Sequence, residues 1–203
     1  MYDMCYLNMR RNRSQQIGYV ESFYQKETYF LLQLQLANAY TLRGDISLAI
    51  DRARLMYEEA KETGYDFGMA VANQAIGDAY TIASQYDKAS EAYQNALKEL
   101  SLISPQHPYR TQLLLKASNT LQRKGRLEKA RRVLNDIDKA LLQQPDYATG
   151  FFAAIEKANY AISHGHLSKT YLKEAAKYLQ DMDSIYRLYP EKVTGIKLIG
   201  TRP

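Results

Sequence analysis

Apolar side chains recur at helical spacing along most of the chain, in stripes that short polar segments interrupt. One stripe lies within residues 26–43 and the next within residues 46–63, and Gly44 and Asp45 separate them. Because a helix turns once every 3.6 residues, apolar residues three or four positions apart share one face and predict a helix that packs against a core. Glycine followed by a polar residue favours a helix C-terminus and a tight turn. The pattern therefore predicts antiparallel helices joined in pairs.

The same pattern predicts nine helices over the whole chain. They span residues 2–16, 26–43, 46–63, 67–84, 86–103, 109–124, 127–143, 147–164 and 170–188. On the second of these helices, the predicted core stripe consists of Leu32, Leu36, Ala39 and Tyr40. On the last helix it consists of Leu172, Ala175, Leu179 and Met182. Residues 189–203 have no such periodicity and are predicted to form an irregular tail or linker.

The helix pairs repeat along the chain. Residues 75–100, moved back by 40 positions, match the residue types of 35–60. The turn position recurs as Gly44, Ser84, Gly125 and Gly165. A period of this length is typical of a solenoid, in which each unit shields the apolar side of the next. We predict four units, over residues 29–66, 67–107, 108–146 and 147–188, after a helical segment at 1–28 that we interpret as an orphan half-repeat.

Small residues recur where neighbouring helices are expected to cross. They are Ala37, Gly77, Ser118 and Ala158 on the first helices, and Ala49, Ala89 and Ala130 on the second helices. Small side chains let two helix backbones approach closely, and a larger side chain in such a packed crossing costs about 1–3 kcal/mol. The sequence therefore predicts tight crossings at these positions.

Composition and charge narrow the class of protein but name no partner. The chain is 46% hydrophobic and contains 18 tyrosines, which excludes a disordered segment. Its net charge of +5 permits an acidic partner without requiring one. A single cysteine, Cys5, excludes an internal disulfide framework. No run of about 18 apolar residues occurs, so we predict no membrane insertion.

No motif for catalysis is present in the sequence. It contains no P-loop, no glycine-rich dinucleotide turn, no serine elbow and no HExxH motif. His164 and His166 flank a predicted turn, but they have no cysteine or carboxylate partner at ligand spacing. We therefore expect a protein that is not an enzyme and that has neither a metal nor a cofactor.

The segment IGDAYTIASQYDKASEAYQNAL, residues 76–97, resembles the tetratricopeptide repeat family, and the resemblance extends over roughly residues 30–188. The usual period of that family is about 34 residues, so the units here are longer. The resemblance implies an all-α superhelix of helical hairpins, an α-solenoid, whose first helices line a groove for a protein or peptide. The longer units look like the repeat arrays of bacterial signalling and transcriptional regulators, which implies the sensing or docking region of a larger regulator.

One row of polar residues follows the first helices that would line this groove. Asn38, Asp78, Asn119 and Asn159 recur 40 or 41 positions apart. Their amides and carboxylate could bind the main chain of an extended peptide, or could instead bond neighbouring helices, and the sequence leaves both interpretations open. The other residues predicted at the groove are Leu34, Thr41, Gln74, Thr81, Leu115 and Gln122.

A basic region lies between residues 110 and 132, where Glu128 is the only acidic residue. The candidate basic patch consists of Arg123, Lys124, Arg126, Lys129, Arg131 and Arg132. These positions fall on two predicted helices and their turn, not on one stripe with aromatic residues. The arrangement favours a solvated outer face over a nucleic-acid interface.

Together these features favour a non-enzymatic scaffold that binds a protein or peptide. A self-contained intracellular receptor for a signalling peptide is the first alternative. Nucleic-acid binding through residues 110–132 is the second, and its affinity would fall steeply with salt. The sequence leaves open the identity of the partner and whether exposed tyrosines form a homo-oligomer. The compartment is also open: a complete chain would be cytoplasmic, and a fragment of a membrane-anchored regulator could be periplasmic.

Overall fold

The computed structural model describes residues 23–143, 146–163 and 169–188. Its helices are α2 (Phe23–Arg43), α3 (Ile46–Glu62), α4 (Asp66–Ile82), α5 (Tyr86–Ile103), α6 (Tyr109–Arg123), α7 (Leu127–Gln143), α8 (Tyr147–Ser163) and α9 (Lys169–Leu188). Each lies where the sequence predicts a helix, although α2 begins three residues earlier than expected. The predicted helix at 2–16, the tail at 189–203, and the residues Cys5, His164, Gly165 and His166 lie outside the described residues.

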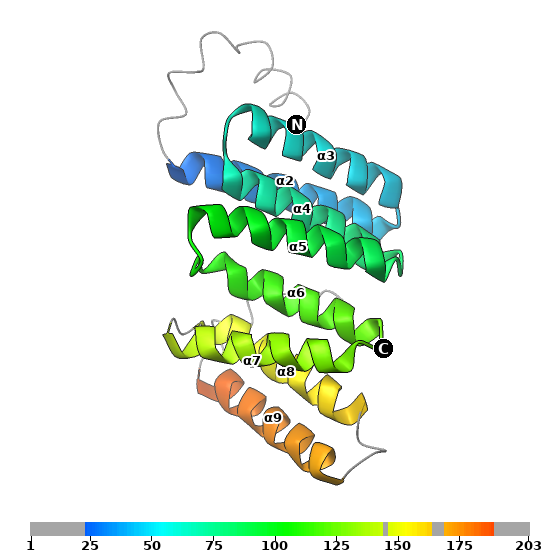
Figure 1. The fold of residues 1–203 in the computed structure, drawn as a ribbon, viewed down its shortest axis with the longest axis vertical. Helices are drawn as coiled ribbons and strands as arrows, with labels where there is room; N and C mark the ends of the chain where they lie inside the picture. The colour runs from blue at the N-terminus through cyan, green and yellow to red at the C-terminus, as the bar shows by residue number, and fades with distance from the viewer. Residues whose placement is uncertain (1–22, 144–145, 164–168, 189–203) are drawn as a thin grey trace.

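Consecutive helices pack as hairpins, and the hairpins stack along the long axis of the molecule (Figure 1). Within the hairpins, α2 packs on α3, α4 on α5, α6 on α7 and α8 on α9. Between hairpins the first helices pack on one another, α2 on α4, α4 on α6 and α6 on α8. The chain is therefore an all-α superhelix of helical hairpins, which confirms the predicted fold class.

The turn inside each of the first three hairpins has the same backbone hydrogen bonds. After α2, the N–H of Gly44 donates to the carbonyl of Thr41 over 3.1 Å, and the following N–H donates to the carbonyl of Tyr40 over 3.0 Å. The same pair of bonds ends α4 at Ser84 and α6 at Gly125. The turn residue is left-handed each time, with φ of 91°, 58° and 72°, as this helix-ending motif requires. The predicted spacing of 40 and 41 residues is therefore confirmed at three turns.

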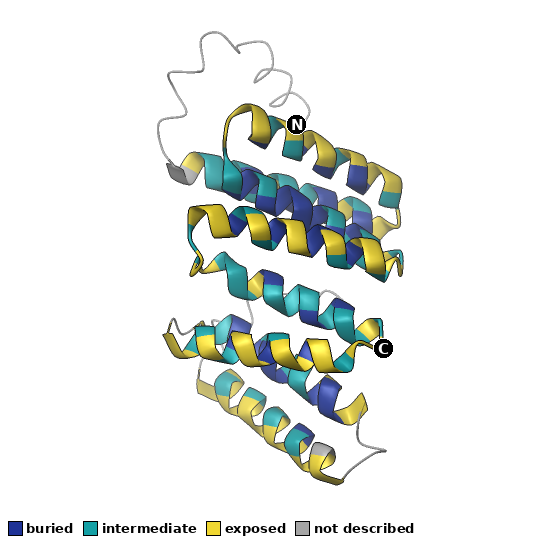
Figure 2. Cartoon of the chain, viewed as in Figure 1, coloured by how far each residue is buried: buried dark blue, intermediate teal, exposed yellow. Residues whose placement is uncertain are grey.

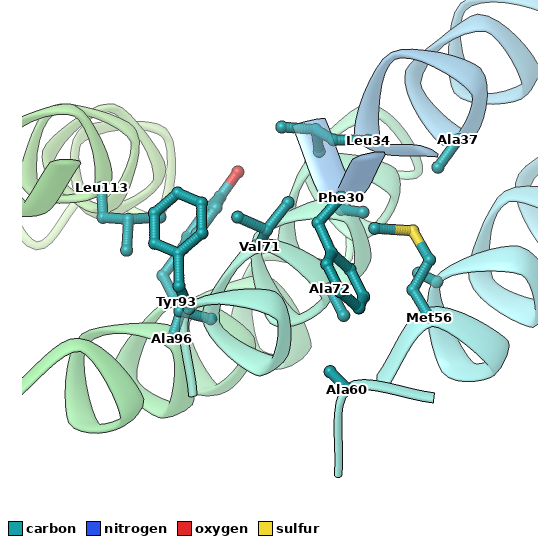
Figure 3. Packing of buried hydrophobic residues seen from close by; sticks show 14 of the residues in the cluster. Phe30, Leu34, Ala37, Met56, Ala60, Val71, Ala72, Tyr93, Ala96 and Leu113 are labelled. Atoms are coloured by element: carbon teal, nitrogen blue, oxygen red, sulfur yellow. The ribbon is translucent and has the colours of Figure 1, made fainter. Parts of the chain in front are cut away.

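The largest core cluster is continuous from α2 to α6. Figure 3 shows Phe30, Met56, Val71, Tyr93 and Leu113, one from each of these five helices, within the same cluster. The small residues predicted at the crossings are buried. In the middle of the stack, α4 packs on α2, α3, α5 and α6, and its residues are buried on nearly every side (Figure 2). This surrounding explains why α4 is apolar over most of its circumference.

The predicted core stripe of α2 is wrong. Leu32 is 59% exposed and Ala39 is exposed, while Leu36 and Tyr40 are only half-buried. Because α2 packs on both α3 and α4, burial follows the face that lies between these two neighbours. That face consists of Phe30, Leu34, Ala37 and Thr41.

The predicted core stripe of α9 is only partly correct. Ala175 is buried and Met182 is half-buried, but Leu172 and Leu179 are 50% and 45% exposed. Among the described helices, α9 packs extensively only on α8. One neighbour covers a narrower face than two neighbours do, so the two leucines remain in contact with solvent.

Candidate functional site

Asp78 on α4 is the centre of a polar network that joins the first helices. Its carboxylate accepts a hydrogen bond from the hydroxyl of Tyr93 (2.6 Å) and pairs with the ammonium of Lys116 (2.9 and 3.0 Å to its two oxygens). The side chain of Asp78 is only 12% exposed, whereas that of Lys116 is 37% exposed. Tyr93 comes from α5 and Lys116 from α6, so this one carboxylate links three helices.

Gln74 extends the network one turn earlier on α4. Its amide N–H donates weakly to Asp78 over 3.4 Å, and its carbonyl accepts from the hydroxyl of Tyr109 over 2.6 Å. Burial is the main cause that raises the pKa of Tyr109 and of Tyr93 above 10.0, and the nearby charge of Asp78 raises both further. Both tyrosines therefore stay protonated and act as hydrogen-bond donors at neutral pH.

Hydroxyl groups continue the contact between α4 and α6. The hydroxyl of Thr81 donates to the carbonyl of Gly77 over 2.8 Å and lies 3.3 Å from the hydroxyls of Tyr93 and Thr120. The hydroxyl of Thr120 in turn donates to the carbonyl of Lys116 over 3.0 Å. These bonds satisfy polar groups that would otherwise be costly to bury.

Glu156 on α8 makes the corresponding link to α6. Its carboxylate accepts from the amides of Asn119 (2.8 Å) and Gln122 (3.0 Å), and Gln122 also donates to the Glu156 carbonyl. Burial raises the pKa of Glu156, although the two amides and Arg123 oppose that shift. The guanidinium of Arg123 donates to the Asn119 carbonyl over 2.9 Å, which orients that amide.

These side chains form two bonded groups, one around Asp78 and one around Glu156, and we call the two groups together the polar network. Its members are Gln74, Asp78, Thr81, Tyr93, Tyr109, Lys116, Asn119, Thr120, Gln122 and Glu156. Five of the ten predicted groove residues belong to it. The sequence left open whether the polar row binds a peptide or bonds neighbouring helices. Asp78 and Asn119 bond neighbouring helices.

The remaining predicted groove residues are not drawn into the network. Leu34 and Thr41 are each 3% exposed, so neither lines an open groove as predicted, and the hydroxyl of Thr41 donates to the Ala37 carbonyl. Leu115 is half-buried against the core cluster of α7 and α8. Asn38 is half-buried and Asn159 is exposed. In the polar row, therefore, Asp78 and Asn119 are bonded to neighbouring helices, whereas Asn38 and Asn159 at the two ends are more open to solvent.

The sequence interpretation missed the partners of the polar row. Lys116, Tyr109 and Glu156 each lie 35 to 38 residues from their partners, a few positions short of the repeat period. The sequence does contain a chemical signal for such a pair, because the lysine Lys116 on one first helix comes about one repeat unit after the carboxylate of Asp78 on the previous first helix. Residues matched at equal positions in the repeat do not reveal such offset pairs.

The predicted basic patch lies mostly on the surface. Arg126, Lys129 and Arg132 are exposed on α7 and the turn before it, as is Arg131. Lys124 pairs with the carboxylate of Asp87 on α5. The exposed positions agree with a solvated face.

Comparison with protein-family models finds no match to this chain, and no curated protein matches it. Within the described residues, no helix has the length and hydropathy needed to cross a membrane. That part of the chain also holds no group of three or more metal-ligating side chains close enough to bind an ion.

Proposed function

We propose that the chain is a non-enzymatic, tetratricopeptide-like scaffold that docks an extended segment of a protein partner on its first helices. The observation that carries the proposal is the polar network, because it holds half-exposed side chains of α4 and α6 in fixed positions beside the polar row. Side chains that are already held in place lose less conformational entropy when a partner binds.

Lys116 shows how a side chain of this network could contact a partner. An ammonium group has three N–H donors, and the two short contacts to Asp78 use at most two of them. At least one N–H remains available to a carbonyl or carboxylate oxygen, because the side chain of Lys116 is 37% exposed. Asn119 is similar, since its amide gives one N–H to Glu156 and has a second one left. The fixed donors at this face favour an acceptor-rich partner, such as a peptide main chain or an acidic side chain.

The resemblance to regulator arrays leads us to propose further that this scaffold is the sensing or docking region of a larger bacterial regulator. An output module encoded in the same reading frame after Pro203 would support this placement. A stop codon directly after Pro203 would count against it.

Site-specific photocrosslinking in cells tests the docking face. A benzophenone side chain at exposed Asn159 on α8 reports on the first helices, and the same group at exposed Arg132 on α7 is the matched control. We expect a discrete crosslinked protein from position 159 that is lost with Lys116→Met, and none from position 132. Crosslinks that form equally from both positions, or only from position 132, would refute the proposed face.

A further inference from the structure

A second polar site lies on another face of α4, away from the polar network. The second helices α3 and α5 lie on either side of α4, which forms a floor between them (Figure 1). A hollow of about 350 Å³, open to solvent, lies between these three helices. Asn73 and Ile76 of α4 form its floor, one turn of helix apart. Its volume falls in the range of about 300–1,000 Å³ that is usual for ligand sites.

Asn73 is the unusual residue of this hollow. It is only 8% exposed, and its side chain makes no hydrogen bond with any described part of the protein. Its neighbour Gln74 is similarly buried, at 4% exposed, but bonds both Tyr109 and Asp78. Within the described residues the fold gives this amide no protein partner, so its donors and its acceptor remain for water or a ligand in the hollow.

Asn73 lines the hollow, and its amide is not among the fully enclosed polar groups that lack a partner. The hydroxyl of Ser118, by contrast, is fully enclosed without a partner, and Ser118 does not line this hollow. A side-chain amide offers two N–H donors and one carbonyl acceptor. A peptide main chain presents the complementary pair of groups, one carbonyl and one N–H per residue.

The walls of the hollow carry balanced charge. Arg54 and Glu58 come from α3, and Lys98 and Glu99 come from α5, so each wall contributes one cation and one anion. A polyanion would meet as much repulsion as attraction there, which argues against nucleic acid or phosphate as the ligand. A neutral main chain that carries side chains of either sign fits both walls.

Two further lining residues match a peptide. Asn95 of α5 places a second amide at the wall, where it is exposed, and Tyr57 of α3 adds a half-buried aromatic ring. Tyr57 and Ile76 supply the apolar area, and the other six lining residues are charged or amide side chains, which suits a polar main chain better than an apolar ligand. The hollow is open to solvent, which suits a segment that lies across the surface better than an enclosed small molecule.

We propose that the cleft between α3 and α5 binds an extended peptide segment whose main chain pairs with the amide of Asn73. The site is separate from the docking face on the first helices and does not depend on it.

The test uses a random 12-residue peptide library displayed on phage and selected on the full chain. Selected peptides are then measured by fluorescence anisotropy on the wild type and on Asn73→Leu, which is similar in size but makes no hydrogen bond. Gln94→Leu is the matched control because it changes an exposed amide on α5 outside the hollow. Asn159→Leu reports on peptides that bind the first-helix face instead.

We expect at least one peptide family whose affinity falls about ten-fold or more with Asn73→Leu, while both control variants bind within about two-fold of the wild type. We also expect Asn73→Leu to keep or slightly raise the melting temperature, because leucine is a better helix former than asparagine. If no peptide is selected, or every peptide binds Asn73→Leu as well as the wild type, the proposal is wrong. Peptides that lose affinity only with Asn159→Leu would overturn it too, while supporting the first-helix face.

If Asn73→Leu lowers both the melting temperature and the peptide affinity, the loss of affinity has two explanations, a structural role of Asn73 and a binding role. Asn95→Leu decides between them because Asn95 is exposed and its replacement should leave the melting temperature unchanged. The proposal then requires a loss of affinity with Asn95→Leu. Unchanged affinity in that variant would contradict it.

Discussion

Gly77→Ala would place a methyl group where the ring of Tyr93 already lies against α4. A Cβ atom at position 77 would be 2.6 Å from Cε1, 2.8 Å from Cδ1 and 2.9 Å from Cζ of Tyr93. These separations are well below van der Waals contact, so either the ring or the backbone of α4 must move. Tyr93 is only 2% exposed and its hydroxyl is bonded to Asp78, so the ring has little room to move.

The magnitude follows from three contributions. Overpacking in a filled core costs about 1–3 kcal/mol, and a weakened hydrogen bond to a charged acceptor adds on the order of 1 kcal/mol. The higher helix propensity of alanine, relative to glycine, raises the free energy of unfolding by about 1 kcal/mol. We therefore expect the free energy of unfolding to fall by about 2 kcal/mol. In a urea titration followed by circular dichroism, the midpoint should fall by about 1 M with an unchanged slope.

Gly150→Ala is the matched control in α8. The nearest atoms to its Cβ would be Cδ1 of Ile185 at 3.8 Å and Cδ1 of Leu141 at 3.9 Å, which is ordinary contact. The same substitution should therefore stabilise the protein by about 0.5 kcal/mol. If Gly77→Ala were as harmless as Gly150→Ala, the close approach of Tyr93 to α4 and the reasoning on small residues at the crossings would be refuted.

Three further predictions concern the turns, the buried tyrosines and the basic face. Ser84→Gly should stabilise the protein by about 1 kcal/mol because Ser84 has a left-handed φ of 58°. Gly125→Ser should destabilise the protein by a similar amount, and urea midpoints equal to that of the wild type would contradict both expectations. Above pH 10, Tyr93 and Tyr109 lose their protons in the unfolded chain but keep them in the folded protein. The free energy of unfolding should therefore fall as the pH rises, by roughly 1.4 kcal/mol per pH unit for each of these two tyrosines. Tyr93→Phe should make that decline shallower in urea titrations between pH 9 and 11, and an unchanged slope would show that Tyr93 ionises freely. Replacing Arg126, Lys129 and Arg132 together by alanine should change the free energy of unfolding by less than about 0.5 kcal/mol per residue, since all three are exposed; a larger loss would show that they support the fold.

The helices and turns could be predicted from the sequence because each depends on local residues. A left-handed turn residue needs glycine or a residue that tolerates the strain, and Gly44, Ser84 and Gly125 mark the period. The exposed faces were harder to predict, as Leu32 on α2 and Leu172 on α9 show. Which face of a helix is buried depends on how many neighbours the helix has and on which side they lie, and the periodicity of one helix does not contain that information.

The sequence could predict that a row of polar residues follows the first helices, but not how these residues are bonded. The first helices do carry a polar row, but the partners of Asp78 come from α5 and α6, 15 and 38 residues away. Asn73 shows no signal in the sequence that separates it from Gln74 beside it. Only the packing of α3, α4 and α5 places one amide in a hollow and the other in the polar network.

The proposed docking face depends on the polar contacts that join α4 to α6 and α6 to α8, which are the first helices of three successive hairpins. A double-mutant cycle between Asp78 and Lys116 tests these contacts most directly, because these residues lie on different hairpins and are bonded over 2.9 Å. The variants are Asp78→Asn, Lys116→Met and the pair, each measured by urea unfolding. Since Lys116 is partly exposed, we expect a coupling free energy of about 1 kcal/mol. Single effects that add to the double effect within about 0.3 kcal/mol would show that α4 and α6 are not joined through this pair, and would contradict the account.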